Sequence, residues 1–590
     1  MSVQFRPMTA QRFYFIIFCA SALLAVIAFP SSILSVLHGH LVDGDSYMRL
    51  LRIEQGLRRG YLSNRVFRDD SGHPLVIEWS RLVDGFILAL SAPLAPFLGW
   101  HRALFIGGVA TQPLFAGALG VSLAFAVAPV AERQFLWAAP AIGLLLPGIR
   151  GFDPFGVVHY HIILLASIAL TLGWCLRARD GAIRPMLYAG ISGGFAIWIM
   201  PETMPFVMLG FATLALLWLF RPIGAGLAVC GAGFLVTTSL ATLIDPPYGG
   251  PLIAETDRLS IIYVALAAAT FLALLWFAIL DRKTLSSPRR ASLGIIGAAL
   301  CFVVWLALYP RVALGPFGLI PGRDMRLFYG HMTEVQPVTS LDGIGGLLAP
   351  GLVAAAYALF RAITDRTDRR AVIAWIMLAV GILLAVGLTQ RMLIFQQIPA
   401  GFVAALVPIA LTQITRLEPA TPIRAASLRI GLLAVLIFGP YMPSIIKAEL
   451  HPSKPHQALC STDGIAPLLA PASGKIVLTN VDYVPQLLYR TRIIAVGSLY
   501  QHGIAGYLLD RTAWRTPVGT TPPPQFQRTG AQFVLFCNTK QLNYLGQPTK
   551  LDALWPSLAQ HRLPPWLHQI GPTTAQGFRL YRVVGRAKSH

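Results

Sequence analysis

Charged residues are scarce in this 590-residue chain: they make up 12% of it, against 55% hydrophobic residues. A soluble domain carries about a quarter charged residues, so this composition excludes an ordinary soluble enzyme. The mean hydropathy of +0.62 indicates that lipid is the solvent for most of the chain. We therefore predict a polytopic α-helical membrane protein.

Acidic residues are the scarcer of the two charged classes, with 26 Asp and Glu against 47 Lys and Arg and a formal net charge of +21. In a soluble protein this excess would suggest nucleic acid. Here the arginines lie mostly in short connections between apolar runs, where they indicate membrane topology. We expect no nucleic-acid partner.

Cysteine is also rare, and the six cysteines show no metal-ligand spacing. Cys19, Cys175, Cys230 and Cys301 fall inside apolar segments and are expected to be core residues. Cys460 and Cys537 lie in the C-terminal part, where an oxidising compartment would favour a disulfide between them.

Long apolar runs dominate what is present. The first run is too long for a signal-peptide core, so we interpret it as a retained span. Thirteen spans are predicted: 13–37, 102–130, 135–149, 157–176, 186–200, 203–220, 223–244, 261–280, 292–309, 345–360, 371–389, 393–413 and 428–446.

Alternate connections carry most of the arginines, among them Arg177, Arg179, Arg221 and Arg370. The positive-inside rule then places the N-terminus in the cytoplasm, and an odd span count places residues 447–590 outside. The preference for Arg over Lys suggests a bacterial source, so we expect an inner-membrane protein with a periplasmic C-terminal domain.

Three long outer connections, 38–101, 245–260 and 310–344, interrupt the membrane part, which we assign to residues 1–446. Residues 47–57 have apolar side chains at helical spacing, which predicts an amphipathic helix on the outer leaflet. Beyond residue 446 the composition resembles a soluble protein. Four short buried strands are predicted there, at 475–481, 492–498, 531–537 and 577–584, which indicates a small α/β domain.

Polar residues beside a bilayer are costly, so those at span ends on one side are functional candidates. Five such clusters lie on the predicted outer face: DGDSYMR at 43–49, RGFDPFGVVHYH at 150–161, PE at 201–202, YGHMTEVQP at 329–337 and QRML at 390–393. Carboxylates from separate loops can converge on a divalent cation such as Mg²⁺ or Mn²⁺, and arginine can bind phosphate through two hydrogen bonds.

The order and sidedness of these motifs resemble the catalytic subunit of the oligosaccharyltransferase family, within the GT-C glycosyltransferases. Asp43 followed by Arg49 is similar to that family's first-loop motif, and Glu334-Val-Gln-Pro337 is similar to its late-loop segment. Arg391 is similar to the arginine of its penultimate long span, which contacts the donor phosphate.

The resemblance implies roles for these residues. Asp43, Asp45 and Glu334 would be catalytic, and Asp45, Asp153 and Glu334 would be ligands of a possible divalent cation. Arg391, Arg49 and Arg150 would bind the donor phosphate. Further possible site residues are His159, His161, Glu202, His331, Glu78 and Arg81.

Two departures from the family bear on the acceptor. The second-loop motif of the family has two acids, whereas Asp153 here is followed by Pro154 and Phe155. The family's Trp-Trp-Asp segment, which reads the hydroxyl of the glycosylation sequon, has no counterpart in 447–590. We therefore predict a lipid, a glycan or an O-linked protein site as acceptor rather than an asparagine sequon.

Structural interpretations compete with these roles. Asp43 can be a helix N-cap, Asp153 before a proline can start a turn, and Arg391 can reach lipid headgroups from a span end. Glu334 and Glu202 can be solvated carboxylates. His159 and His161 would point to different faces of a helix and can simply line a loop or helix start.

Together these features predict a membrane glycosyltransferase that uses a polyprenyl-phosphate or polyprenyl-diphosphate donor on the outer face. The alternatives are a lipid-glycan transporter, which would place ionisable groups at mid-membrane, and a non-catalytic scaffold. Acids gathered at span ends on one side favour the enzyme.

Overall fold

The computed structural model describes residues 9–283, 285–320, 322–417, 422–450, 460–538, 545 and 550–584. The chain forms two compact units. Unit 1 comprises Met1–His40, Gly108–Gly318 and Glu334–Pro452, and unit 2 comprises Leu41–Gly107, Leu319–Thr333 and Ser453–His590. Most of the first long loop and part of the late loop thus group with the C-terminal segment.

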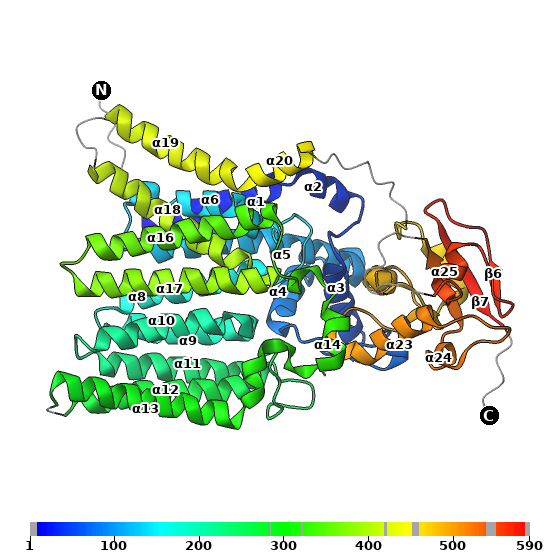
Figure 1. The fold of residues 1–590 in the computed structure, drawn as a ribbon, viewed down its shortest axis with the longest axis horizontal. Helices are drawn as coiled ribbons and strands as arrows, with labels where there is room; N and C mark the ends of the chain where they lie inside the picture. The colour runs from blue at the N-terminus through cyan, green and yellow to red at the C-terminus, as the bar shows by residue number, and fades with distance from the viewer. Residues whose placement is uncertain are drawn as a thin grey trace. The chain divides into compact units, whose positions relative to one another are not determined.

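Unit 1 is helical (Figure 1). Its helices are α1 (Ala10–Ile27), α2 (Pro30–Leu37), the C-terminal part of α5 (Ala95–Val127), α6 (Ala138–Leu145), α7 (Pro147–Arg150), α8 (His161–Ala178), α9 (Ile183–Ile199), α10 (Met204–Trp218), α11 (Gly224–Ile244), α12 (Ile261–Asp281), α13 (Ser287–Leu308), α16 (Ala349–Thr364), α17 (Arg369–Arg391), α18 (Gln397–Leu417), α19 (Pro422–Phe438) and α20 (Met442–Leu450).

Eleven helices in the described residues are long and apolar enough to cross a membrane. The other two of the thirteen predicted spans correspond to shorter helices. The segment predicted at 135–149 is divided by Pro147 into α6 and α7, and α9 has 17 residues. Proline also ends the first predicted span early, because α2 begins at Pro30 after the break that follows α1.

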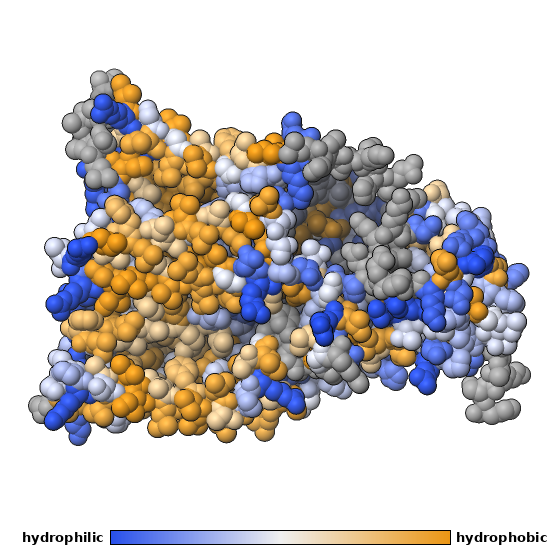
Figure 2. Space-filling view, viewed as in Figure 1, coloured by the Kyte–Doolittle hydropathy of each residue, from blue (hydrophilic) through white to orange (hydrophobic). Residues whose placement is uncertain are grey.

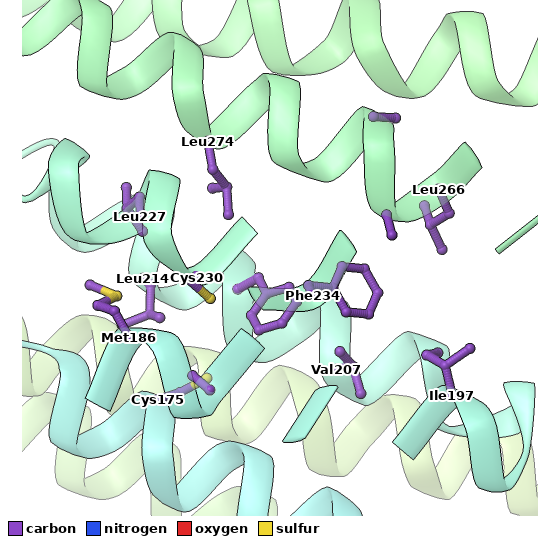
Figure 3. Close-up of a cluster of buried hydrophobic side chains, with 14 of the residues drawn as sticks. Cys175, Met186, Ile197, Val207, Leu214, Leu227, Cys230, Phe234, Leu266 and Leu274 are labelled. Atoms are coloured by element: carbon purple, nitrogen blue, oxygen red, sulfur yellow. The ribbon is translucent and has the colours of Figure 1, made fainter. Parts of the chain in front are cut away.

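The helices of unit 1 approach closely where small residues face a neighbour. A Cβ on Gly190 of α9 would lie 2.0 Å from the carbonyl oxygen of Cys230 in α11, so only glycine permits this contact. Around this contact lies a buried apolar cluster drawn from α8 to α13, which includes Cys175, Leu214 and Phe234 (Figure 3). Cys175 and Cys230 are therefore core residues, as predicted, but the same prediction is wrong for Cys19, which is exposed, and Cys301 is only half-buried.

Apolar side chains also cover the outside of the helices. Figure 2 shows hydrophobic residues along their length and hydrophilic residues at their ends. Leu352 and Val353 of α16 are 48% and 69% exposed, and similar exposed residues occur on α13 and α19. A surface of this kind requires lipid around it, so the chain is an integral membrane protein.

Unit 2 contains a five-stranded sheet with the order β4-β3-β5-β7-β6. Its strands are β3 (Ile476–Leu478), β4 (Ile494–Ala495), β5 (Phe533–Cys537), β6 (Leu567–Ile570) and β7 (Phe578–Val583). β3 pairs in parallel with β4 and β5, whereas β7 pairs antiparallel with β5 and β6. All four predicted strands are confirmed, and β6 is an additional edge strand.

The other elements of unit 2 come from three parts of the chain. They are α3 (Gly44–Leu57), β1 (Arg65–Val66), β2 (Leu75–Val76), α4 (Arg81–Ser91), the N-terminal part of α5, α14 (Gly322–Tyr329), α21 (Ala466–Leu469), α22 (Val484–Arg490), α23 (Ile504–Arg515), α24 (Pro524–Gln527) and α25 (Leu554–Ala559). Phe328 of α14 packs into the same buried cluster as Trp514 and Trp555 of the C-terminal segment.

The first long loop covers one edge of the sheet. The carbonyl of Arg68 accepts a hydrogen bond from the amide of Ala495 in β4, at 3.0 Å. The Arg68 guanidinium donates to the carbonyls of Leu488 and Thr491, both at 2.6 Å. An edge strand with free amides invites unwanted pairing, and this loop protects it.

The predicted helix at 47–57 is present as α3, but it does not lie on a leaflet with one face exposed. Eleven of its fourteen residues are buried, including Arg49 and Arg52 on its polar face. The polar face is buried because it contacts charged partners inside the protein, which its sequence pattern alone does not reveal.

A disulfide joins Cys460 and Cys537 in unit 2, with a Cα separation of 5.8 Å. It connects the start of the C-terminal segment to the end of β5, closing 77 residues of sequence. The pairing expected from the two cysteines is present.

Candidate functional site

Candidate residues of unit 2 share one face of α3. Asp45, Arg49 and Arg52 are spaced by four and three residues, which aligns their side chains along a helix. Asp43 precedes the helix as its N-cap, with its carboxylate accepting a hydrogen bond from the amide of Ser46 at 2.8 Å. The N-cap interpretation of Asp43 is thus confirmed, and Asp45 is the acid that lies on the helix itself.

Arg49 and Arg52 both bind the carboxylate of Asp84 from α4. The nitrogen–oxygen distances are 2.9 Å for Arg49 and 2.5 Å for Arg52, and all three side chains are no more than 1% exposed. The Asp84 carboxylate therefore ties two residues of α3 to α4 in the interior of unit 2. We find Arg49, predicted to bind the donor phosphate, engaged with this internal acid.

Trp79 connects this ion cluster to Asp45. The guanidinium carbon of Arg49 lies 4.6 Å from the ring centroid of Trp79, and Trp79 makes an edge contact with Tyr500 at 5.6 Å. The Tyr500 hydroxyl donates to Asp45 Oδ1 at 2.8 Å. Burial and the neighbouring Asp45 raise the pKa of Tyr500 well above its usual value, so it remains a donor to the carboxylate.

The remaining unit 2 candidates lie close to the same loop. Arg81 begins α4 and donates to the carbonyl of Leu62 at 3.3 Å, and Glu78 is half-buried just after β2. His331 follows α14, and burial lowers its pKa, with a smaller contribution from Arg511. The sequence did not identify Asp84 or Tyr500 as site residues, although a charged residue in an already singled-out loop was a signal for Asp84.

Among the unit 1 candidates, Asp153 is fully buried in the loop before α8. Gln112 of α5 donates to its backbone carbonyl at 2.8 Å and also to its Oδ1. Burial raises the pKa of Asp153 to about 8, and the Gln112 hydrogen bond opposes this only partly. Its Oδ2 is buried without a hydrogen-bond partner among the described residues. A buried carboxylate oxygen of this kind suits a cation, because a bound cation would compensate for the lost hydration.

The two histidines do not share a helix, because α8 begins at His161 and His159 precedes it. Their ring centroids are 5.5 Å apart, and His161 stacks on Phe152 at 4.0 Å. His161 is buried and His159 half-buried. Both therefore line the loop that carries Asp153.

Arg150, a predicted phosphate ligand, contacts protein groups instead. Its guanidinium donates to the carbonyl of Ala28 at 2.8 Å and lies over the ring of Phe29 at 4.8 Å. These contacts bridge α7 to the break between α1 and α2. The arrangement gives Arg150 a part in positioning the helices of unit 1.

Two motif segments of unit 1 meet through the backbone. The amide of Val338 donates to the carbonyl of Gln390 at 3.0 Å, and the amide of Leu393 donates to the carbonyl of Gln336 at 3.1 Å. The Gln390 side chain also binds the Val338 carbonyl, at 2.8 Å. The late-loop segment with half-buried Glu334 therefore lies beside the end of α17, where Arg391 is exposed.

The loop of Asp153 packs against the continuation of this second segment. A Cβ on Gly148 would lie 2.3 Å from the carbonyl oxygen of Gln396, and one on Gly151 would lie 2.8 Å from its side-chain nitrogen. Only glycine allows these approaches. Three motifs predicted separately, around Asp153, Glu334 and Arg391, are thus joined within unit 1.

A further buried polar cluster follows α11 in the loop 245–260. Arg258 binds Asp245 at 2.9 Å, with both side chains no more than 3% exposed, and the Trp198 indole also donates to Asp245, at 3.2 Å. Glu202 is half-buried in a short turn (Pro201–Thr203) close in sequence to Trp198. Sequence reasoning noted this loop but not its charges, which were a signal because they flank two apolar spans.

No family model and no curated protein matches this sequence. Solved structures do match its fold. The archaeal oligosaccharyltransferase AglB from Archaeoglobus fulgidus, in complex with an inhibitory peptide and a dolichol-phosphate, has a TM-score of 0.67 at 11% identity, over 89% of this chain and 69% of that one.

Two further structures of the Archaeoglobus fulgidus oligosaccharyltransferase match as well. A complex with Zn and sulfate has a TM-score of 0.62 at 13% identity, over 88% of this chain and 67% of that one. A form tethered to an acceptor peptide with an NVT sequon has a TM-score of 0.61 at 11% identity, over 89% and 69%. The chain therefore has an oligosaccharyltransferase-like GT-C fold with a small α/β domain near its C-terminus.

Proposed function

We propose that this chain is a membrane glycosyltransferase that transfers a sugar or glycan from a polyprenyl-phosphate or polyprenyl-diphosphate donor to an acceptor on the outer face of the membrane. The observation that carries the proposal is the meeting of the Asp153, Glu334 and Arg391 segments within a fold that matches an oligosaccharyltransferase. Dolichol-phosphate in one matching structure supports a lipid-linked donor.

The reaction we propose is a single displacement. A nucleophilic oxygen or nitrogen of the acceptor forms a bond to the anomeric carbon while the bond to the phosphate oxygen breaks, and the electron pair leaves with the lipid phosphate. Inversion at the anomeric carbon follows from one displacement. Asp45, with Asp43 as the alternative, takes the acceptor proton or orients the acceptor.

Arg391 stabilises the charge that develops on the leaving phosphate. Its exposed guanidinium at the end of α17 can offer two parallel donors to phosphate oxygens. Arg49 and Arg150 are both engaged with protein groups, so we assign them to positioning and leave the phosphate contact to Arg391.

A divalent cation fits the chemistry of Asp153, whose buried Oδ2 has no hydrogen-bond partner among the described residues. Glu334 is the other carboxylate of unit 1 that we propose as a ligand. When bound, such an ion would neutralise phosphate charge in the ground state and in the transition state. Zn in one matching structure is a property of that protein and leaves the choice between Mg²⁺, Mn²⁺ and other ions to experiment.

For the acceptor we propose a lipid, a glycan or an O-linked protein site. The support is the absence of a Trp-Trp-Asp segment from residues 447–590, since a site that reads a hydroxyl depends on its buried donors and acceptors.

The acceptor class can be identified with the reconstituted protein and a labelled polyprenyl-phosphate sugar. Membrane, glycan and peptide fractions are added in turn, and the fraction that becomes labelled contains the acceptor. An Asn-x-Thr peptide should remain unlabelled while another fraction is labelled. Efficient labelling of the sequon peptide would refute this acceptor assignment. Movement of intact donor across the membrane without cleavage would instead favour a transporter.

A further inference from the structure

Unit 1 contains a cavity of about 570 Å³ between α5, α8, α10, α17 and α18. Apolar side chains form most of its wall, with Ala126, Leu172, Leu209, Ala374 and Phe402 as examples from the five helices. Glycines let the surrounding helices approach closely: a Cβ on Gly210 would lie 3.0 Å from the Cys175 sulfur, and one on Gly401 would lie 2.7 Å from a Leu165 methyl. Such a lining suits a hydrocarbon chain and offers few polar groups to a sugar.

Charged side chains lie at one end of this cavity. Arg179 and Asp180 follow α8, and Asp368 and Arg370 begin α17, and all four line the cavity. Asp180 binds Arg370 at 3.3 Å and Arg221 at 2.8 Å, and Arg179 lies 3.8 Å from it. Three arginines thus contact Asp180, while Asp368 caps the start of α17, so these five side chains carry an excess of one positive charge.

This charged end remains open to solvent. The side chains of Arg221, Arg370 and Asp180 are 48%, 50% and 53% exposed. The guanidinium groups can therefore accept a further anionic partner without first leaving a buried pair. The N-terminus of α17, at Arg369, adds its partial positive charge at the same place.

The cavity is distinct from the proposed catalytic region. α8 begins beside the Asp153 loop and ends at Ala178, next to Arg179. Its 18 residues span about 27 Å, so the charged mouth lies near the opposite end of the helix from Asp153. These arginines also belong to the connections that the charge pattern assigns to the cytoplasmic side.

We infer that this cavity binds an anionic phospholipid of the membrane, with an acyl chain between the helices and the phosphate headgroup on Arg179, Arg221 and Arg370. The chemistry is that of basic pockets between transmembrane helices, where apolar walls accept the chain and arginines select the headgroup charge. The inference does not depend on the proposed glycosyl transfer.

Two kinds of variant test it in the full-length protein. The double variant Arg221→Gln/Arg370→Gln removes headgroup contacts at half-exposed positions, where the fold depends little on the charges. Arg184→Gln is the matched control, an exposed arginine that begins α9 at the same end of unit 1 and does not line the cavity. Ala374→Phe fills the cavity, and Ala356→Phe on the exposed side of α16 is its control.

Native mass spectrometry with phosphatidylglycerol and phosphatidylcholine measures binding. We expect one saturable phosphatidylglycerol site that is weakened at least about tenfold by the double variant and by Ala374→Phe, and unchanged in both controls. Equal affinity for the two lipids, or no effect of the double variant, would overturn the inference. Tighter binding of polyprenyl phosphate at the same site would assign the cavity to the donor and overturn it too.

Trp375, which lines the cavity, gives a local readout. Phosphatidylglycerol with brominated acyl chains should quench a saturable part of the tryptophan fluorescence, and Trp375→Phe should abolish that part. Saturable quenching that persists in Trp375→Phe would place the bound chain elsewhere and refute the assignment. This measurement does not need the cavity-filling variant Ala374→Phe, so it still tests the inference if that variant fails to fold.

Discussion

Two arginine–aspartate clusters in this protein have the same chemistry and opposite environments. In unit 2, Asp84 binds Arg49 and Arg52, with all three side chains at most 1% exposed. In unit 1, Asp180 binds Arg221 and Arg370, with all three about half exposed. The buried cluster cannot exchange partners and so fixes α3 and its acid Asp45. The exposed cluster is free to bind a ligand, so burial decides whether arginine is structural or available.

The largest expected effect comes from breaking the buried cluster. Asp84→Asn removes the carboxylate that Arg49 and Arg52 share, and breaking a buried ion pair by removing one partner costs about 3–5 kcal/mol. Thermal unfolding in detergent should show a large loss of stability or of folded yield. A variant as stable as wild type would show that these arginines have another anionic partner.

Asp153 is a buried acid that pairs with no arginine among the residues that the structure describes, and its removal should have the opposite effect on stability at neutral pH. Its pKa is raised to about 8 in the folded protein from an ordinary value near 3.8. The proton is held more tightly by the folded state, so its contribution is fully present below about pH 4 and is lost as the pH rises through about 8.

Asp153→Asn should therefore flatten the decline of stability between pH 6 and 8, by an amount on the order of a few kcal/mol. Urea unfolding as a function of pH measures it. Asp69→Asn is the matched control, because burial raises the pKa of Asp69 to only about 6, so its effect should lie at lower pH. An unchanged slope above pH 6 in Asp153→Asn would contradict the assignment.

Local sequence patterns predicted part of this structure, but not the contacts between residues far apart in the chain. Four strands, the apolar helices and the α3 helix were predictable because each depends on a local pattern. β6 was not, since its burial alternates weakly along four residues after Pro565. Long-range partners were not predictable either: Asp84 lies 35 residues from Arg49, Gln112 lies 41 from Asp153, and Tyr500 lies 455 from Asp45. The order of the motifs indicated the candidate acids, but not the residues that form hydrogen bonds or ion pairs with the site.

Arg391 is an exposed arginine at the end of α17. If it binds the donor phosphate, Arg391→Ala should weaken donor binding by about 2 kcal/mol, and Arg391→Lys by less, because lysine keeps the charge but loses the paired donors. A titration with labelled donor measures this. Arg366→Ala, an exposed arginine just before the other end of α17, is the control. Equal affinities in all four proteins would indicate that Arg391 only contacts lipid headgroups.

The smallest expected effect on stability comes from breaking the exposed cluster. Asp180→Asn removes the central carboxylate of the exposed cluster, and exposed ion pairs contribute about 0–1 kcal/mol. Its unfolding temperature should stay close to that of wild type, unlike that of Asp84→Asn. A loss as large as that of Asp84→Asn would mean that the Asp180 cluster is structural.

Cleavage of the donor tests the central claim most directly. The full-length protein in proteoliposomes should release polyprenyl phosphate from a labelled polyprenyl-phosphate sugar when its acceptor is present, and Asp45→Asn and Glu334→Gln should each lower the maximal rate. If Glu334 binds a divalent cation, Glu334→Gln should also need a higher metal concentration. Full activity in the presence of a chelator would exclude a catalytic role for a metal ion and would leave direct base catalysis by a carboxylate. Full activity of both variants, or intact donor with every acceptor fraction, would contradict the glycosyltransferase account.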